Sequence, residues 1–169
     1  MTCMERRKAV KILWKVLAPD WCPRRAAAAG LVATLVYSVF MEEDRYIIGN
    51  YFNDVQFIQG MLVGKESSKG SWLLSWGVHL LNGVALAQVY AALAKRWLPG
   101  PGWLKGSLFA SGFVAAAWTL TPLADKYHPL IKDGEMPKLA TWKSFWQNIL
   151  RHLAFGITLG WLYRSREER

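Results

Sequence analysis

The fold of this chain is decided by residues 71–93, which read SWLLSWGVHLLNGVALAQVYAAL. This stretch carries no charged side chain over 23 residues. A helix needs about 20 predominantly apolar residues to cross a hydrocarbon layer about 30 Å thick. The stretch therefore predicts a membrane-spanning helix, and the remaining segments are interpreted outward from it.

Three further segments are predicted to cross the membrane. Residues 106–124 are uncharged, residues 26–44 end in an acidic cluster, and residues 145–163 contain Arg151 and His152. We therefore expect an all-α fold. It is a four-transmembrane-helix bundle made of two similar helical hairpins, forming a single domain over residues 26–163.

The segments outside the predicted spans are polar or amphipathic. Residues 5–17 have the pattern of a basic amphipathic helix on the inner membrane surface, within a cytoplasmic N-terminus of residues 1–25. Residues 45–64 predict a helical segment along the outer interface or a shallow re-entrant segment. We interpret residues 125–143 as a polar outer loop and residues 164–169 as a cytoplasmic tail.

Composition and charge exclude several classes of protein. The chain has 169 residues, 53% hydrophobic and 20% charged, which excludes a disordered chain. With four spans and both termini on one side, that side holds thirteen of the 21 basic residues but four of the 12 acidic ones. This sorting by alternate loops follows the positive-inside rule, predicts cytoplasmic termini and argues against nucleic acid as a partner.

Two of the predicted spans share a repeated pattern. The residues His79, Gly83, Ala87 and Tyr90 recur 73 positions later as His152, Gly156, Gly160 and Tyr163. The spacing places each set on one helix face, and its small residues allow another backbone to approach closely. Further small-residue stripes are predicted at Gly30, Thr34 and Ser38 and at Ser107, Ser111 and Ala115.

The chain resembles an uncharacterised family of bacterial four-helix inner-membrane proteins. The resemblance rests on Gly-Leu-Val-Ala-Thr at residues 30–34 and on the two His-x-x-x-Gly spans that end in Tyr, and it covers residues 26–163. It implies a multi-pass protein of the bacterial inner membrane and no established activity.

His79 and His152 are the candidate cofactor-binding residues. At one depth on two helices, they could place imidazoles on either side of a haem or another tetrapyrrole. Gly83 and Gly156 would make room for the macrocycle, and Arg151 would hold a propionate. We favour a structural hydrogen-bonding pair, with a tetrapyrrole, a metal or a proton relay as alternatives.

Arg151 is the one charge that must lie inside a predicted span. An ionisable group at that depth is either functional and paired or long enough to snorkel to the headgroups. We favour snorkelling and name Asp125, then Asp44, as the candidate partners. For the cluster Glu42, Glu43 and Asp44 we favour a solvated helix end over a cation site.

Three functions remain open. The favoured hypothesis is an accessory or structural subunit of a larger membrane complex, with lipids and other integral membrane subunits as partners. The first alternative is a redox or photosynthetic subunit that binds haem or a chlorophyll; the second is a small transporter or channel acting as an oligomer. No soluble-enzyme motif is present, so we expect no enzymatic activity and no certain cofactor.

Overall fold

The structure is a computed structural model that describes residues 21–164. Every regular element in this part of the chain is helical, which confirms the all-α prediction. The elements are α2 (Pro23–Ile48), α3 (Asp54–Val63), α4 (Lys69–Val89), α5 (Gly102–Trp118), α6 (Thr121–Tyr127), α7 (Pro129–Lys132) and α8 (Trp142–Leu162). A π-helical turn, η1 (Tyr90–Ala94), and a 3-10 turn, η2 (Lys95–Trp97), extend α4. The predicted amphipathic helix over residues 5–17 lies outside the described residues.

Local sequence signals set the helix ends. Pro23 starts α2, where its fixed φ suits a first helical turn and its missing N–H costs no hydrogen bond. Gly49 ends the same helix at a φ of 64°, a left-handed conformation that favours glycine. Asn53 caps α3 by accepting hydrogen bonds from two backbone N–H groups, and Ser68 forms a capping box with Ser71 at the start of α4.

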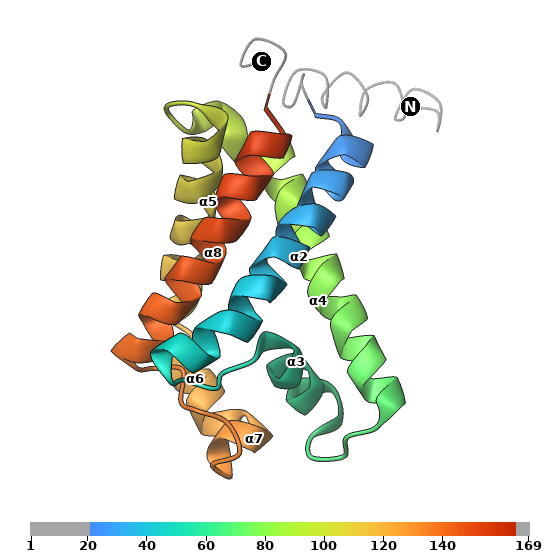
Figure 1. Cartoon of the computed structure of the whole chain (residues 1–169), viewed down its shortest axis with the longest axis vertical. Helices are drawn as coiled ribbons and strands as arrows, with labels where there is room; N and C mark the ends of the chain where they lie inside the picture. The colour runs from blue at the N-terminus through green and yellow to red at the C-terminus, as the bar shows by residue number, and fades with distance from the viewer. Residues whose placement is uncertain (1–20, 165–169) are drawn as a thin grey trace, which may run out of the picture.

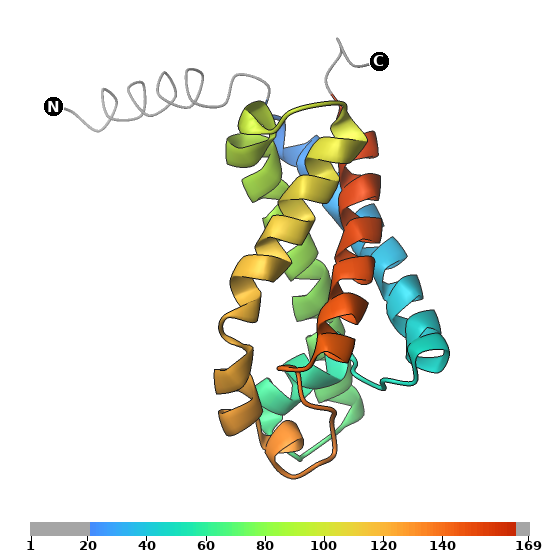
Figure 2. The same ribbon diagram turned by 90° about the vertical axis from the view of Figure 1, so that its left-hand side faces the viewer.

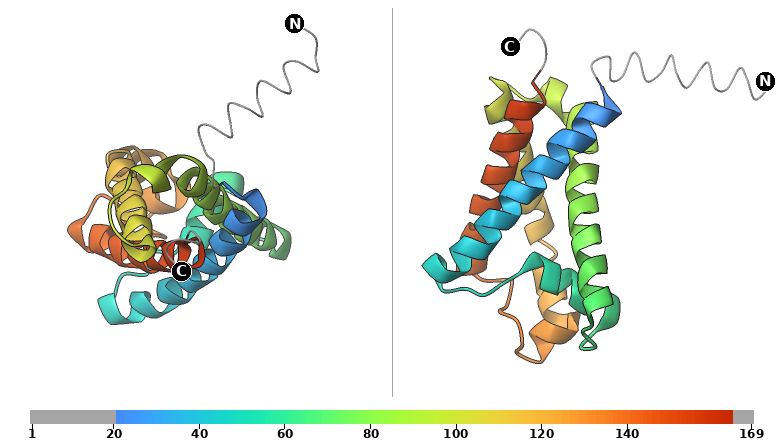
Figure 3. Two further views of the ribbon diagram at one scale, coloured as in Figure 1. Left: turned by 90° about the horizontal axis from the view of Figure 1, so that it is seen from above. Right: turned by 45° about the vertical axis from the view of Figure 1, so that its right-hand side comes forward.

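The four long helices pack in the order α4, α2, α8, α5. Figure 1 shows α2 lying between α4 and α8, and the right-hand view of Figure 3 gives the same order. Contacts are extensive between α5 and α8, between α2 and α4 and between α2 and α8. Helices α4 and α5 form no such packed interface in the described chain. They approach where η1 and η2 pack on the start of α5, and they diverge toward the other end (Figures 1 and 2).

Glycine seams bring the paired helices together. A Cβ at Gly106 would overlap the backbone of Gly156, and a Cβ at Gly30 would overlap Ala87 on α4. The small-residue stripe of α5 that faces α8 consists of Gly102, Gly106 and Ala110. The predicted α5 stripe was therefore wrong in register, because Ala115 is exposed.

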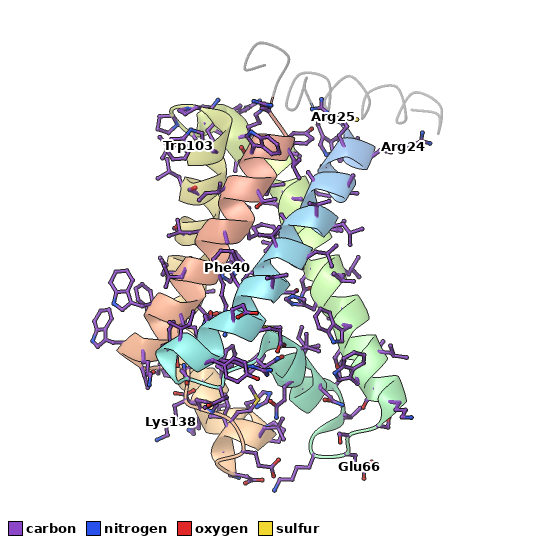
Figure 4. All side chains as sticks on the ribbon, viewed as in Figure 1. Arg24, Arg25, Phe40, Glu66, Trp103 and Lys138 are labelled. Atoms are coloured by element: carbon purple, nitrogen blue, oxygen red, sulfur yellow. The ribbon has the colours of Figure 1, made fainter. Side chains whose placement is uncertain are left out.

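The start of α2 and the end of α8 lie side by side. The Cys22 backbone N–H donates to the Tyr163 hydroxyl at 2.8 Å, and Arg25 donates to the carbonyl of Arg164 at 3.1 Å. In the described chain this end carries six basic residues and no acidic one: Arg24, Arg25, Lys95, Arg96, Lys105 and Arg164. Figure 4 shows Arg24, Arg25 and Trp103 at this end and Glu66 and Lys138 at the opposite one.

Within residues 21–164, two helices are long and apolar enough to cross a membrane, namely Pro23–Ile48 and the continuous run Lys69–Trp97. The pair α5 and α6 passes the same test together, with a bend of 52° between them, and would make a third. Helix α8 is not among them: charged and amide side chains in its first half, such as Lys143, Gln147 and Arg151, make it too polar.

The segment predicted as a polar outer loop is folded. Besides α6 and α7, it supplies most of a second apolar core beneath the helices: Phe52, Leu130, Ile131, Met136 and Leu139. Asp125 orders this region because its carboxylate accepts hydrogen bonds from the backbone of Leu139 and Ala140 at 2.7 and 3.0 Å. The segment after α2 contains a helix, as expected for residues 45–64, and this helix, α3, packs against α4.

Candidate functional site

A cavity of about 560 Å³ opens where α4 and α5 diverge. Its walls are mainly apolar and aromatic, and polar side chains gather on its inner wall. The polar lining residues are Thr34, Tyr37, Asp54, His79, Asn82 and His152. A concave apolar site with a few convergent polar groups is the usual form of a small-molecule site.

Arg151 supports this inner wall from behind. Its side chain is completely buried, and its Nε and Nη2 donate to the two carboxylate oxygens of Asp44 at 2.5 and 2.6 Å. Its Nη1 donates to Asp54 Oδ2 at 3.0 Å, and Nη2 also reaches the carbonyl of Phe52. Gln147 completes the cluster by donating to Asp44 and to the carbonyl of Asn50. One guanidinium thereby joins α8 to α2 and α3.

This geometry corrects three predictions. Arg151 does not snorkel, because no part of its side chain is exposed. Asp125 is not its partner, since both oxygens of that carboxylate bind backbone N–H groups elsewhere. Asp44, the second candidate, is confirmed as a partner, so the solvated-helix-end interpretation is wrong for Asp44.

His79 faces α2 and is 8% exposed. Its Nε2 lies 3.1 Å from Ser38 Oγ, whose own hydrogen is donated to the carbonyl of Thr34 at 2.8 Å. Nε2–H must therefore be the donor to Ser38, and a neutral imidazole then keeps a lone pair on Nδ1. That nitrogen has no partner among the described residues.

His152 lines the same cavity from α8. Its Nδ1 lies 2.9 Å from the carbonyl of Asn148, which accepts only, so Nδ1 carries the hydrogen and Nε2 keeps the lone pair. The structure brings the two histidines together around Tyr37, whose ring centroid lies 5.6 Å from His79 and 4.9 Å from His152. The Tyr37 hydroxyl donates to Asp54 Oδ2 at 2.9 Å.

The two repeated glycines serve helix packing. Thr34 of α2 occupies the space where a Gly83 side chain would lie, although Gly83 also borders the cavity. Gly156 faces the backbone of Gly106 and does not line the cavity. The repeat also brings its tyrosines together, because the rings of Tyr90 and Tyr163 pack edge to face at 6.4 Å.

The side chains are better arranged for one axial ligand than for two. His152 Nε2 has no partner among the residues that the structure describes, and the Nδ1–H bond of this histidine to a carbonyl is the arrangement that orients metal-binding imidazoles in general. His79 would have to give up Ser38 to ligate through Nε2. Over residues 21–164 no group of three or more His, Cys, Asp or Glu is placed to hold a metal ion by itself.

Outside the spans, an exposed ion pair ties two loops together. Lys65 pairs with Asp133 and lies 3.5 Å from Glu135. The hydrogen bond from Lys65 lowers the pKa of Asp133, and the same bond raises the pKa of Lys65. His128 lies nearby under α3, stacked on Phe57 at 4.3 Å, and takes no part in the cavity.

Asp54 and Tyr37 are two central site residues that the sequence does not reveal. Asp54 interrupts the apolar period of residues 45–64 and resembles a surface residue of an interfacial helix. The available signal is indirect: a buried arginine needs carboxylates, and few acidic residues lie near the spans.

Comparisons of the chain with protein-family models, with curated proteins and with solved structures find no match. The function must therefore follow from the geometry of the site.

Proposed function

We propose that the chain is an integral membrane protein in which α2, α4, the pair α5 and α6, and α8 all cross the bilayer. The basic end, where α2 starts and α8 ends, lies in the cytoplasm. The support is the charge asymmetry between the two ends of the described chain. Helix α8 qualifies despite its polar residues because Gln147, Asn148 and Arg151 are buried, while its outer face carries Trp146, Leu150, Ile157 and Trp161.

Within the bilayer, we propose that the protein binds a lipophilic small molecule in the cavity between α4 and α5. The observation that carries this proposal is a pair of imidazole nitrogens, His79 Nδ1 and His152 Nε2, that have no partner among residues 21–164 and lie on a mainly apolar cavity wall. An acyl chain or an apolar partner helix would leave both nitrogens without a hydrogen bond, which is unfavourable in an apolar medium. The occupant therefore combines an apolar body with a polar group.

Blocking the cavity tests this proposal. Ala117 and its neighbour Ala116 are both exposed, but only Ala117 lines the cavity. We expect native mass spectrometry of the protein released from membranes in mild detergent to show a bound small molecule. Ala117→Trp should lose it and Ala116→Trp should retain it. A wild-type protein without added mass, or equal retention by both variants, would contradict the proposal.

A tetrapyrrole is the second candidate, favoured by the free Nε2 of His152 and its oriented Nδ1–H. Bound there, it would supply redox or light-absorbing chemistry. We expect a Soret or chlorophyll band in the purified protein if this candidate is correct. His152→Leu should abolish the band, and His79→Leu should leave most of it. A spectrum without such a band rejects this candidate but leaves the general ligand site standing.

The cavity and the carboxylates of Asp44 and Asp54 also bear on whether the protein is an accessory subunit or a transporter. An accessory subunit that docks through small-residue seams has less support, because the glycines of those seams already face neighbouring helices of the same chain. A transporter gains support, because Asp44 is buried in α2 and Asp54 borders the cavity. We propose that the protein lies in the bacterial inner membrane, where membrane lipids contact it.

A further inference from the structure

The buried charges around Arg151 do not balance. One guanidinium contacts two carboxylates, and the salt bridges within the described chain bring no other cation to either. Arg151 holds Asp44 through two hydrogen bonds but reaches only one oxygen of Asp54. The cluster therefore carries one excess negative charge, and that charge lies mainly on Asp54.

The excess charge borders the cavity. Asp54 lines it together with Tyr37, His79 and His152. Tyr37 and Arg151 both donate to Oδ2, while Oδ1 accepts no hydrogen bond from the described residues. An unbalanced charge in an apolar setting is costly, so a cation that reached Asp54 would be strongly favoured there.

The polar atoms of the inner wall that have no partner within the described part of the chain are all acceptors. They are Asp54 Oδ1, His79 Nδ1 and His152 Nε2. The hydroxyls of Thr34 and Tyr37 are already committed to Gly30 and Asp54. Asn82 is the only other polar lining residue, and it is exposed at the rim. A complementary ligand must therefore bring hydrogen-bond donors.

We infer that the ligand is a lipophilic amine in its protonated form, with its ammonium group against Asp54 and the two histidines. This inference rests on the proposed function and narrows it to one chemical class. An ammonium group supplies both the missing charge and up to three N–H donors. The aromatic faces of Phe57, Phe113 and Phe155 suit a cation attached to an apolar body.

The test compares three probes that share a dodecyl chain: dodecylamine, dodecanol and dodecanoate. Each is added at the same mole fraction of the detergent micelle, and the unfolding temperature of the purified protein is measured, because a ligand that binds the folded state raises it. We expect dodecylamine to raise the unfolding temperature and the other two to have little effect. Equal stabilisation by dodecanol would overturn the inference.

Two variants tie the effect to the site. Asp54→Asn leaves Arg151 balanced by Asp44, and we expect it to weaken amine binding about tenfold or more, the effect of losing about 1.4 kcal/mol. Ala117→Trp keeps every charge and should abolish the stabilisation, while Ala116→Trp should preserve it. If Asp54→Asn does not fold, the comparison of dodecylamine stabilisation in Ala117→Trp and Ala116→Trp tests the inference. Full amine stabilisation in Ala117→Trp would contradict the inference.

The remaining outcomes separate this inference from the proposal on which it rests. Stabilisation by dodecanol that Ala117→Trp abolishes would keep the cavity as a ligand site and reject selection by charge. No stabilisation by any probe would overturn both. A phosphatidylethanolamine arm identifies the source of the ammonium group: stabilisation by it as well as by dodecylamine indicates a lipid headgroup, and by dodecylamine alone a free amine.

Discussion

Arg151 holds three segments of the chain together through charge-assisted hydrogen bonds. We predict that Arg151→Met lowers the free energy of unfolding by about 3–5 kcal/mol, because it leaves the buried Asp44 and the half-buried Asp54 without a cation. Denaturant titration in detergent micelles measures this loss.

Arg45→Met provides the matched control for that measurement. Arg45 pairs with Glu42 at the protein surface, 2.6 Å apart, so its loss should cost less than about 1 kcal/mol. Similar losses in the two variants would mean that the Arg151 cluster contributes no more than a surface ion pair.

The ion pair of Lys65 and Asp133 gives a prediction on pH. The lowered pKa of Asp133 means that the pair is complete above the ordinary carboxyl value of 3.8 and is lost as the pH falls through the lowered pKa. The raised pKa of Lys65 means that the pair persists until the pH passes the ordinary lysine value of 10.5 and rises through the raised pKa. This tie between the loops is therefore constant around neutrality.

The corresponding measurement is the titration of the Asp133 carboxyl carbon by NMR. Lys65→Met should move its midpoint up toward the ordinary value, whereas Lys138→Met, a change at an exposed lysine without an ion pair, should not. An unchanged midpoint in Lys65→Met would show that Lys65 does not cause the shift.

Single residues also show where the sequence is informative. His79 and His152 could be selected because they repeat at the same helix position, and the structure does bring them to one cavity. The partners of Arg151 were harder to select: Asp44 was only the second candidate and Asp54 was not named, because they precede Arg151 by 107 and 97 positions. Pairing over such a distance depends on how α2, α3 and α8 cross, which no local pattern encodes.

Among the helices, the seam between α5 and α8 gives the sharpest prediction. Gly106 faces the backbone of Gly156, so Gly106→Ala forces the two helices apart and should cost about 1–3 kcal/mol. Gly112 lies on the same helix with nothing near its missing side chain, so Gly112→Ala should be neutral or stabilise by up to about 1 kcal/mol. Thermal unfolding of the two variants measures the difference, and equal behaviour would argue against close packing at this seam.

The sequence predicts where helices form better than it predicts how they pack. Long apolar runs predicted the positions of α2, α4 and α5, and capping residues explain several of their ends. The seam of α5 was misplaced because the first part of this helix contains two interleaved sets of small residues. One set includes Gly106 and the other includes Ser107, and only one set can face α8. The folded segment after α5 was missed because its apolar residues follow no regular period.

For the whole molecule, the proposed orientation in the bilayer can be tested by thiol labelling. In a background with Cys3 and Cys22 replaced by Ser, a cysteine at the exposed position Pro99 should be protected from a membrane-impermeant thiol reagent added outside right-side-out vesicles. Cysteines at Ser67 and at Lys138 should be labelled, because Lys138 and Glu66, which directly precedes Ser67, lie opposite the basic end (Figure 4). Labelling of Pro99→Cys, or protection of both outer positions, would contradict the proposed orientation.

The mouth of the cavity is bordered by exposed apolar side chains, among them Met61, Val89 and Phe113. In the proposed orientation this mouth faces acyl chains rather than water, so an occupant would enter sideways from the surrounding lipid. The quantity that governs occupancy is then the mole fraction of the compound dissolved in the bilayer. Apparent affinity in water should rise with the partition coefficient of the compound, and adding empty liposomes should strip the protein of it by dilution.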